Sequence, residues 1–407
     1  MNTGDTTWIM VCAVLVFIMT PGVALFYGGL TRRKNVLSIL MQCFVIMCLI
    51  TLQWVLIGYS LAFGPDTGWG IIGGLDWVGL RGVGMEPHGY AETIPHYVFM
   101  IFQLQFAIIT AAIMVGAFAE RMKFSAFLVL ILLWTTFVYD PIAHWAWGDS
   151  GWLDAMGALD FAGGIVVHVS SGVSALLIAI MIGRRVGLDK TAFTPHNLPF
   201  TVIGGALLWF GWFGFNAGSA LAADGIAANA FVTTMVATAA AGLTWVFIEW
   251  KHHGAPTVLG VVTGAIAGLV AITPACGLVT PMASIPIGIV SSTLCYWAIT
   301  MLKPRLGYDD SLDVFGLHGV AGIWGTIAVG LFAVEALAGT NGLFYGGAKL
   351  LLIQMIYMAV CIAYALVVTW ILFKLVDAVI GIRVTREDEI VGLDLTQHQE
   401  GAYTTLE

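Results

Sequence analysis

An apolar segment that continues to Ile182 opens with the sequence Asp160-Phe161-Ala162-Gly163-Gly164-Ile165-Val166-Val167-His168-Val169-Ser170-Ser171-Gly172. At about 1.5 Å per helical residue, the segment is long enough to cross a bilayer. His168 follows Asp160 by eight residues, which places it about 12 Å deeper along a helix. Because an ionisable ring is costly in hydrocarbon, His168 indicates a pathway or a paired site inside the membrane.

A second segment repeats this plan with the sequence Leu312-Asp313-Val314-Phe315-Gly316-Leu317-His318-Gly319-Val320-Ala321-Gly322. In both segments a leucine–aspartate pair precedes the histidine, a glycine (Gly172 or Gly322) follows it by four residues, and an apolar helix comes next. The sequence therefore predicts two buried histidines, His168 and His318, in matching positions of two halves.

The composition predicts an all-α integral membrane protein. Of the 407 residues, 59% are hydrophobic and only 10% are charged, too few charges to cover the surface of a soluble protein of this length. The net charge of −8 sits mostly in loops and the tail, so we expect no nucleic-acid partner. The six cysteines lack metal-type spacing, so we predict neither a disulfide nor a zinc site.

Apolar runs broken by charged residues, glycine and proline predict eleven transmembrane helices. Each run is about 20 residues long and does not alternate as the strands of a membrane barrel do. Their approximate limits are 8–30, 36–63, 97–119, 124–146, 160–182, 199–220, 227–249, 256–274, 279–301, 315–337 and 346–380.

The distribution of lysine and arginine predicts the orientation of these helices. Fourteen basic residues fall on one side of the predicted membrane and only Arg81 and Lys349 on the other. Since the basic side faces the cytoplasm, the N-terminus is expected outside and the C-terminus inside. Five spans on each side of residue 190 then form an inverted 5+5 repeat, of the kind that places a transport site near the midplane.

This plan predicts a membrane domain and a tail. The membrane domain covers residues 1–380, with repeat halves at about 8–185 and 199–337 and an eleventh, long helix at about 346–380. Residues 381–407 form a cytoplasmic C-terminal tail. His168 enters the membrane from outside and His318 from inside, so both can reach its middle.

Several roles are open to the two histidines. Each can be a buried ring that bonds to a neighbouring helix, and imidazole also suits zinc, iron or copper. Two histidines are too few for a metal, and neither span supplies a cysteine or glutamate nearby as a third ligand. Two imidazoles that donate and accept to one another suit a small polar neutral solute or a proton relay better.

Aromatic residues gather near one predicted face of the membrane. An interfacial belt explains many of the fifteen tryptophans, but not phenylalanine and glycine interleaved with asparagine and serine at a helix end. Converging rings beside one hydroxyl predict a small-cation site. Asp160 is expected to cap its helix by accepting from the N–H groups two and three residues on, and to add negative potential below the site. The aromatic stretches are Phe102–Phe106, Trp145–Gly148 and Trp209–Ser219.

Five motifs stand out in the sequence: Pro21–Leu30, Phe106–Thr110, Asp160–Gly164, Phe215–Gly218 and Leu317–Gly319. They resemble those of the ammonium transporter (Amt/Mep/Rh) family, of the bacterial and archaeal Amt type. The likeness extends over all eleven predicted spans and the tail, and the long glycine-rich motifs make it specific. The external loop from Gly64 to Pro95 has no recognisable signature, and the role of Trp145, beside the expected Trp147, is a departure from the family pattern.

The resemblance implies a homotrimer in the inner (plasma) membrane that takes up nitrogen as ammonium through one pore per subunit. It implies an outer NH4+ site of Phe106, Trp147, Phe215 and Ser219, in which Phe106 and Phe215 also form a stacked gate. It further implies that His168 and His318 are the twin histidines of the pore and that Asp160 is the helix-capping acid. No cofactor, metal or enzymatic activity is expected.

The C-terminal tail mixes acidic and apolar residues between 376 and 407. Composition alone also fits a disordered acidic tail. The resemblance instead implies an ordered tail that docks on the neighbouring subunit and responds to a PII-type signalling protein.

Two alternatives to transport stay open at this point. One is an ammonium receptor with the same fold and little or no flux. The other is a membrane metalloenzyme that uses the two histidines as ligands, which the lack of a third ligand disfavours.

Overall fold

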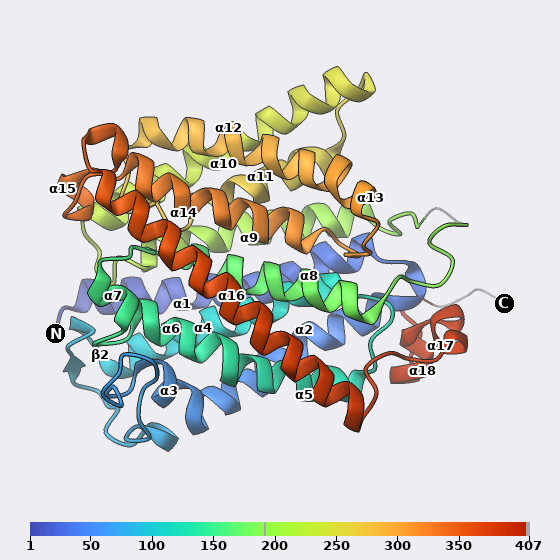
Figure 1. The fold of residues 1–407 in the computed structure, drawn as a ribbon, viewed down its shortest axis with the longest axis horizontal. Helices are drawn as coiled ribbons and strands as arrows, with labels where there is room; N and C mark the ends of the chain where they lie inside the picture. Colours follow the sequence, from blue (N-terminus) through green and yellow to red (C-terminus); the bar gives the residue numbers. More distant parts are fainter. Residues whose placement is uncertain (191–192, 404–407) are drawn as a thin grey trace.

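The computed structural model describes residues 1–190 and 193–403. Its helices run side by side along the longest axis, with the N-terminus at one end and the C-terminal segment at the other (Figure 1). We call these two ends the N-terminal face and the C-terminal face. Residues 404–407, the last four of the predicted tail, lie outside the described part of the chain.

Ten helices in the described residues are long and apolar enough to cross a membrane, which makes the protein a multi-pass membrane protein. An additional apolar helix, α11, spans only 15 residues. It falls within the predicted run 256–274, so the eleven-span count and the orientation of the termini stay predictions.

The first half of the chain, up to Ile182, supplies five of the ten long helices, several of which contain a turn of π-helix. Their bounds are α1 (Thr3–Leu30); α2 (Val36–Gln53) with η2 (Trp54–Gly58) and α3 (Tyr59–Phe63); α4 (His96–Met114) with η4 (Val115–Ala117); α5 (Phe124–Trp134) with η5 (Thr135–Tyr139) and α6 (Asp140–Trp147); and η6 (Gly164–Val169) with α8 (Ser170–Ile182).

The rest of the chain supplies the shorter α11 and the other five long helices, of which α16 is the last. Their bounds are α9 (Leu198–Gly218), α10 (Gly225–His253), α11 (Val258–Ile272), α12 (Pro281–Trp297) with η7 (Ala298–Leu302) and α13 (Lys303–Leu306), η8 (Phe315–Gly319) with α14 (Val320–Phe332), and α16 (Ala348–Val379).

Short elements lie at the two faces of the bundle. Among them, β1 and β2 form an antiparallel hairpin inside the loop 64–95. Their bounds are η1 (Arg33–Asn35), η3 (Val78–Leu80), β1 (Pro87–His88), β2 (Ala91–Pro95), α7 (Trp152–Met156), α15 (Glu335–Ala338), η9 (Leu343–Tyr345), α17 (Arg386–Val391) and α18 (Leu393–His398).

Helix ends follow the capping residues of the sequence. The side chains of Asn2, Asn197, Asp224, Thr257 and Thr280 each accept a backbone N–H at the start of α1, α9, α10, α11 and α12. Because these caps satisfy donors that the first helical turn leaves free, they fix where each span begins.

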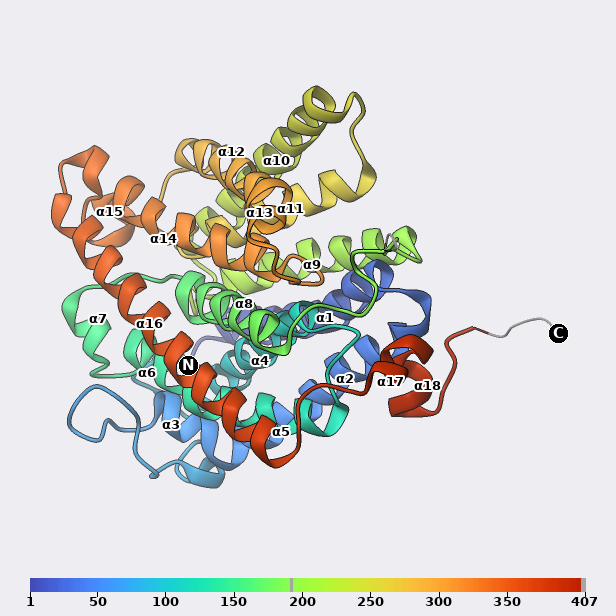
Figure 2. The same cartoon turned by 45° about the vertical axis from the view of Figure 1, so that its right-hand side comes forward.

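The two halves lie side by side around a common centre. Figure 2 shows α1, α4 and α8 in the middle, with α10, α11 and α12 to one side and α2, α3 and α5 to the other. Helix α16 crosses the bundle diagonally and packs against α5, α8 and α14, so it contacts both halves.

Large apolar side chains cover much of the outside of the bundle. Phe44, Phe247 and Leu352 are each more than half exposed in the isolated chain. A soluble protein rarely presents so many apolar side chains to water, whereas hydrocarbon accommodates them. The outer surface therefore suits a lipid environment or further protein contacts.

Candidate functional site

The structure brings the two predicted histidines together in the interior. The Nδ1 atoms of His168 and His318 lie 3.1 Å apart, and the two rings are 5.2 Å apart at 17°. Both side chains are buried. Because a hydrogen bond needs one donor and one acceptor, two neutral rings in this arrangement must differ in tautomer, with only one proton between the two Nδ1 atoms.

The glycines that follow the histidines explain how the two helices approach so closely. A Cβ on Gly172 would lie 2.6 Å from the Cα of Gly319, and one on Gly322 would lie 2.8 Å from the carbonyl oxygen of Gly164. Real Cβ atoms do not come so near to backbone. The repeated glycine therefore lets η6–α8 and η8–α14 cross at the level of the histidines.

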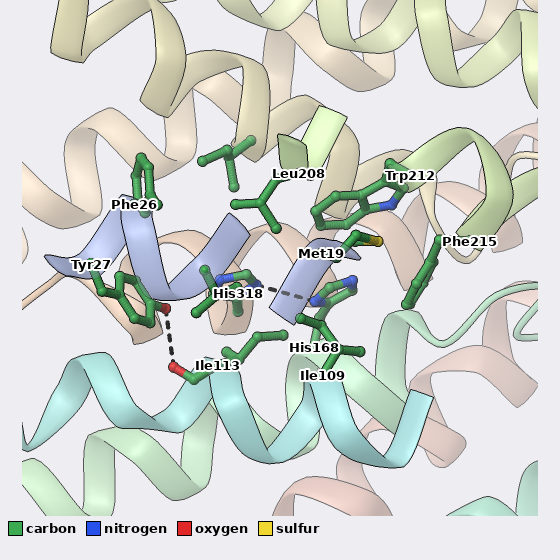
Figure 3. A pocket seen from close by; sticks show the side chains of 12 residues that line it. Met19, Phe26, Tyr27, Ile109, Ile113, His168, Leu208, Trp212, Phe215 and His318 are labelled. Atoms are coloured by element: carbon green, nitrogen blue, oxygen red, sulfur yellow. Dashed lines mark hydrogen bonds between the residues drawn. The ribbon is translucent and has the colours of Figure 1, made fainter. Parts of the chain in front are cut away.

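A narrow cavity runs past the two rings (Figure 3). Its volume of about 10 Å³ is close to the least that holds one water-sized molecule. Apart from the imidazoles and the phenol of Tyr27, its walls are apolar. The lining residues are Met19, Val23, Phe26, Tyr27, Ile109, Ile113, His168, Leu208, Trp212, Phe215, Ile266 and His318.

Two phenylalanine rings separate this cavity from a wider one toward the N-terminal face. The centroids of Phe106 and Phe215 are 4.3 Å apart, with an angle of 31° between the rings. Phe215 lines the narrow cavity, whereas Phe106 lines the wider one, which holds about 250 Å³. The two rings thus lie in contact between the narrow and the wider cavity.

The wider cavity contains three of the four residues predicted for the outer site. Phe106, Trp147 and Ser219 line it, and the rings of Phe106 and Trp147 meet edge to face at 5.9 Å. The Ser219 hydroxyl donates to the carbonyl oxygen of Phe215 at 2.9 Å, which leaves the hydroxyl oxygen able to accept. Phe215 is not among the lining residues of this cavity.

Asp160 caps η6 as the sequence predicts, but it reaches more donors than predicted. Its carboxylate accepts from the N–H group three residues on, that of Gly163, and also from those of residues 164 to 166, at 2.5–3.1 Å. Gly163 is the N-cap residue and has φ of 103°, a conformation that favours glycine. Because of this turn, the Asp160 carboxylate accepts hydrogen bonds from more backbone N–H groups than an ordinary N-cap side chain does.

Two more side chains tie Asp160 to its surroundings. The hydroxyl of Tyr357, on α16, donates to its carboxylate at 3.0 Å. The indole N–H of Trp147 donates to its backbone carbonyl oxygen at 2.8 Å. Asp160 therefore links the wall of the wider cavity to the start of the helix that carries His168.

Two residues that shape the narrow cavity, Trp212 and Tyr27, are not predicted as site residues from the sequence. Trp212 stacks on His168 at 5.4 Å and 16°, and its indole N–H donates to the Thr273 hydroxyl at 2.8 Å. Tyr27 donates to the carbonyl oxygen of Ile113 at 3.0 Å (Figure 3). Both lie in stretches that the sequence singles out, but only the packing assigns them a place beside the histidines.

Trp145 holds the external loop. Its indole N–H donates to the carbonyl oxygen of Ile71 at 2.6 Å, and its ring packs against Trp152 and Tyr364. It is absent from the lining of both cavities. Its neighbour Trp147 is the one that faces the wider cavity.

The described part of the tail is ordered against its own chain at the C-terminal face. Leu393 N–H donates to the Asn35 side chain at 2.8 Å, and Ser38 N–H donates to the Asp394 carboxylate at 2.8 Å. Arg383 donates to the carbonyl oxygen of Ile182 at 2.9 Å. These bonds connect the tail to the turn after α1 and to the end of the helix that carries His168.

Nothing in the described residues supports a metal centre. Residues 1–190 and 193–403 contain no group of three or more histidine, cysteine or acidic side chains that could hold an ion. All six cysteines are free.

Comparisons with known proteins agree with these features. A family model described as "Ammonium Transporter Family" matches residues 7–403. An "Ammonium transporter" of Bacillus subtilis is 54% identical, with 99% of each chain covered. "Ammonium transporter Amt1" of Archaeoglobus fulgidus is 48% identical, over 99% of this chain and 100% of that one.

Solved structures share the fold. The crystal structure of Candida albicans Mep2 is similar with a TM-score of 0.90 and 37% identity, and the match covers 99% of this chain and 90% of that one. A "Sensor Amt Protein" is similar with a TM-score of 0.89 and 30% identity, over 97% of this chain and 98% of that one. The chain belongs to the ammonium transporter family.

Proposed function

We propose that this protein transports ammonium across a membrane by binding NH4+ at the N-terminal face, removing its proton and conducting NH3 past His168 and His318, with or without separate transfer of that proton. The observation that carries the proposal is the hydrogen-bonded histidine pair inside a narrow, otherwise apolar cavity. Ammonia is neutral and close to water in size, and it can both donate to and accept from imidazole.

The chemistry of the cavity favours a neutral solute. An unpaired ion in a low-dielectric interior costs far more than any hydrogen bond returns. The narrow cavity has no acidic lining residue that could balance an ammonium charge. An ion such as K+, which cannot lose a proton, is therefore rejected, whereas ammonium enters as ammonia.

The wider cavity suits the first step. The rings of Phe106 and Trp147 offer their π-electrons to a cation, and Ser219 offers a hydroxyl oxygen. Once the proton has left, the rings of Phe106 and Phe215, whose centroids are 4.3 Å apart, part to admit ammonia. Phe215 belongs to this gate more than to the cation site.

The same proposal includes a location and partners. The basic residues at the C-terminal face support a cytoplasmic location for that face by the positive-inside rule, with the N-terminus outside the cell. We propose the plasma membrane as the location and a homotrimer as the assembly. The ordered tail offers a cytoplasmic surface on which a PII-type regulator can act.

A flux measurement on the purified chain tests the proposal. Proteoliposomes that contain only this protein are exposed to an ammonium jump, while internal pH and current on a solid-supported membrane are recorded. We expect ammonia entry to raise the internal pH faster than in empty liposomes and K+ jumps to give no response. Flux no greater than in empty liposomes would contradict transport.

A receptor function is the second candidate, and the likeness to the "Sensor Amt Protein" favours considering it. A receptor binds ammonium without appreciable flux. Ammonium binding to the purified protein, combined with silence in both recordings, would support the receptor.

A further inference from the structure

Asp140 is a fully buried acid away from the histidine cavity. It is the first residue of α6, directly after the π-helical turn η5, and none of its surface is exposed. It precedes Trp147 by seven residues, so it lies about 10 Å further into the membrane than that ring. Asp140 lines neither of the two cavities, and the proposed transport route does not use it.

Among the described residues, the Asp140 carboxyl has one hydrogen-bond partner, the side chain of Gln53. The amide nitrogen of Gln53 donates to Asp140 Oδ2 at 2.7 Å and to the Thr136 hydroxyl at 3.2 Å. Two atoms of the same pair are buried without any hydrogen bond: Asp140 Oδ1 and Gln53 Oε1. Both are acceptors when the acid is ionised, so neither can satisfy the other.

No cation balances the carboxyl. Asp140 takes part in none of the ion pairs found among the described residues. The elements near η5 and α6, namely α2, η2, α3, α4, α5, α7 and η6, contain no lysine or arginine. The one histidine of α6, His144, is bonded to Asp66 and to the carbonyl oxygen of Ala62.

Helix α16 brings no positive charge near either. Its Tyr364 donates to the carbonyl oxygen of Phe137 at 2.8 Å, which fixes its position beside η5. Lys374 is ten residues further along α16, or about 15 Å away, and Lys349 is about 22 Å away in the other direction. An ionised Asp140 would therefore be a buried charge without compensation, which proteins avoid by neutralising the group.

We propose that the folded protein binds a proton at Asp140, and that the neutral acid pairs with Gln53 through two hydrogen bonds. The proton sits on Oδ1 and is donated to Gln53 Oε1, while the Gln53 amide continues to donate to Oδ2. One proton thus satisfies both of the orphaned atoms. The pair joins α2 to α6 and forms a proton site separate from the two histidines.

The local backbone provides room for this pair. Gln53 ends α2, and Gly58 lies one π-helical turn further on. A Cβ on Gly58 would lie 2.5–2.8 Å from the amide atoms of Gln53. Glycine at this position therefore lets the amide fold back toward Asp140.

Infrared difference spectroscopy tests the proposal. The spectrum of an Asp140→Asn variant, in liposomes at neutral pH, is subtracted from that of the wild type. We expect the wild type to show the carbonyl stretch of a protonated carboxylic acid, shifted by deuterium exchange, that the variant lacks. Asp76→Asn, which removes an exposed acid in the external loop, serves as a control and should leave this band in place.

Two further variants keep the test sharp. Gln53→Leu removes the hydrogen-bond partner of Asp140, and Gly58→Ala displaces it. Both variants should therefore shift the frequency of the carboxylic acid band but should not abolish the band. Loss of a carboxylate band in Asp140→Asn, with no acid band lost, would overturn the proposal. If the proton site is separate from the route, Asp140→Asn keeps its ammonium flux. Loss of flux with folding intact would instead place Asp140 in the transport path.

Discussion

The two histidine-bearing helices have the same plan but are anchored in different ways. At the start of η6, Asp160 accepts hydrogen bonds from four backbone N–H groups and one hydroxyl, and it forms no ion pair with any described residue. At the start of η8, the acid eight residues before His318 is Asp310. Its carboxylate accepts the N–H of Phe315 at 2.8 Å, so Asp310, and not Asp313, occupies the place of Asp160.

Charges surround the second anchor. Lys303 donates to the Asp310 carbonyl oxygen and to the Asp313 carboxylate, both at 2.6 Å. Arg185 bonds both carboxylate oxygens of the adjacent Asp309 at 2.8–2.9 Å. Helix dipoles and hydrogen bonds hold the helix of His168, while ion pairs hold that of His318. The difference teaches that a repeated backbone plan can be supported by unlike electrostatics.

The two histidine-bearing helices cross at the glycines that follow the histidines. Disrupting this close approach should reduce ammonium flux and stability more than any other change. In Gly172→Ala the new Cβ meets the backbone of Gly319, so one helix must move and the histidines separate. We expect ammonium flux to be lost and stability to fall by about 3 kcal/mol, the upper range for overpacking. Flux assays and thermal unfolding in detergent check this, and Gly225→Ala, whose Cβ meets nothing, should behave as the wild type.

Replacing each anchoring acid by its amide measures the contrast between them. Asp160→Asn replaces one acceptor oxygen by an NH2 donor that faces backbone N–H groups. We therefore expect the free energy of unfolding to fall by about 3 kcal/mol, the upper end of the range for leaving a buried polar group unsatisfied. Asp310→Asn faces the N–H group of Phe315 and should cost less. Equal losses in chemical unfolding would contradict the distinction.

Two neighbouring acids of the second anchor should respond to pH in opposite directions. Burial raises the pKa of Asp310 to about 6 in spite of Lys303, whereas Arg185 overcomes the effect of burial and holds the pKa of Asp309 at about 2. Stability from Asp310 is present below about pH 4 and is lost as pH rises through 6. Stability from Asp309, about 2 kcal/mol, is present above about pH 4 and is lost as pH falls through 2.

Unfolding midpoints measured across this pH range, for the wild type and for Asp309→Asn and Asp310→Asn, separate the two contributions. Asp309→Asn should remove the pH dependence between about pH 2 and pH 4, and Asp310→Asn should remove that between about pH 4 and pH 6. Identical curves for all three proteins would remove the electrostatic part of the comparison.

The smallest expected effect comes from removing the Tyr357 hydroxyl, one of the hydrogen-bond donors to Asp160. Tyr357→Phe removes the hydroxyl that bonds Asp160 and leaves four N–H donors in place. We expect a loss of about 1 kcal/mol, typical of one hydrogen bond, with flux retained. Thermal unfolding measures the loss, and a drop as large as that of Asp160→Asn would mean that α16 rather than the N–H groups holds the acid.

Much of this site follows from sequence, because hydropathy and glycine spacing report on helices and their crossings. The structure brings His168 and His318 together and places Phe106, Trp147 and Ser219 around one cavity. The capping pattern of Asp160 does not follow from sequence, since it depends on Gly163 at positive φ and on π-helical turns that composition does not signal. The Leu312-Asp313 pair suggests that Asp313 corresponds to Asp160. In the structure, however, Asp313 adopts φ of 60° and its carboxylate accepts a hydrogen bond from Lys303.

The most direct test compares ammonium flux through wild-type protein and a His168→Ala, His318→Ala double variant in proteoliposomes, with folding verified by thermal unfolding. Transport through the histidine pair predicts that the folded double variant loses its ammonium flux. A folded double variant that conducts ammonium as the wild type does would contradict the mechanism.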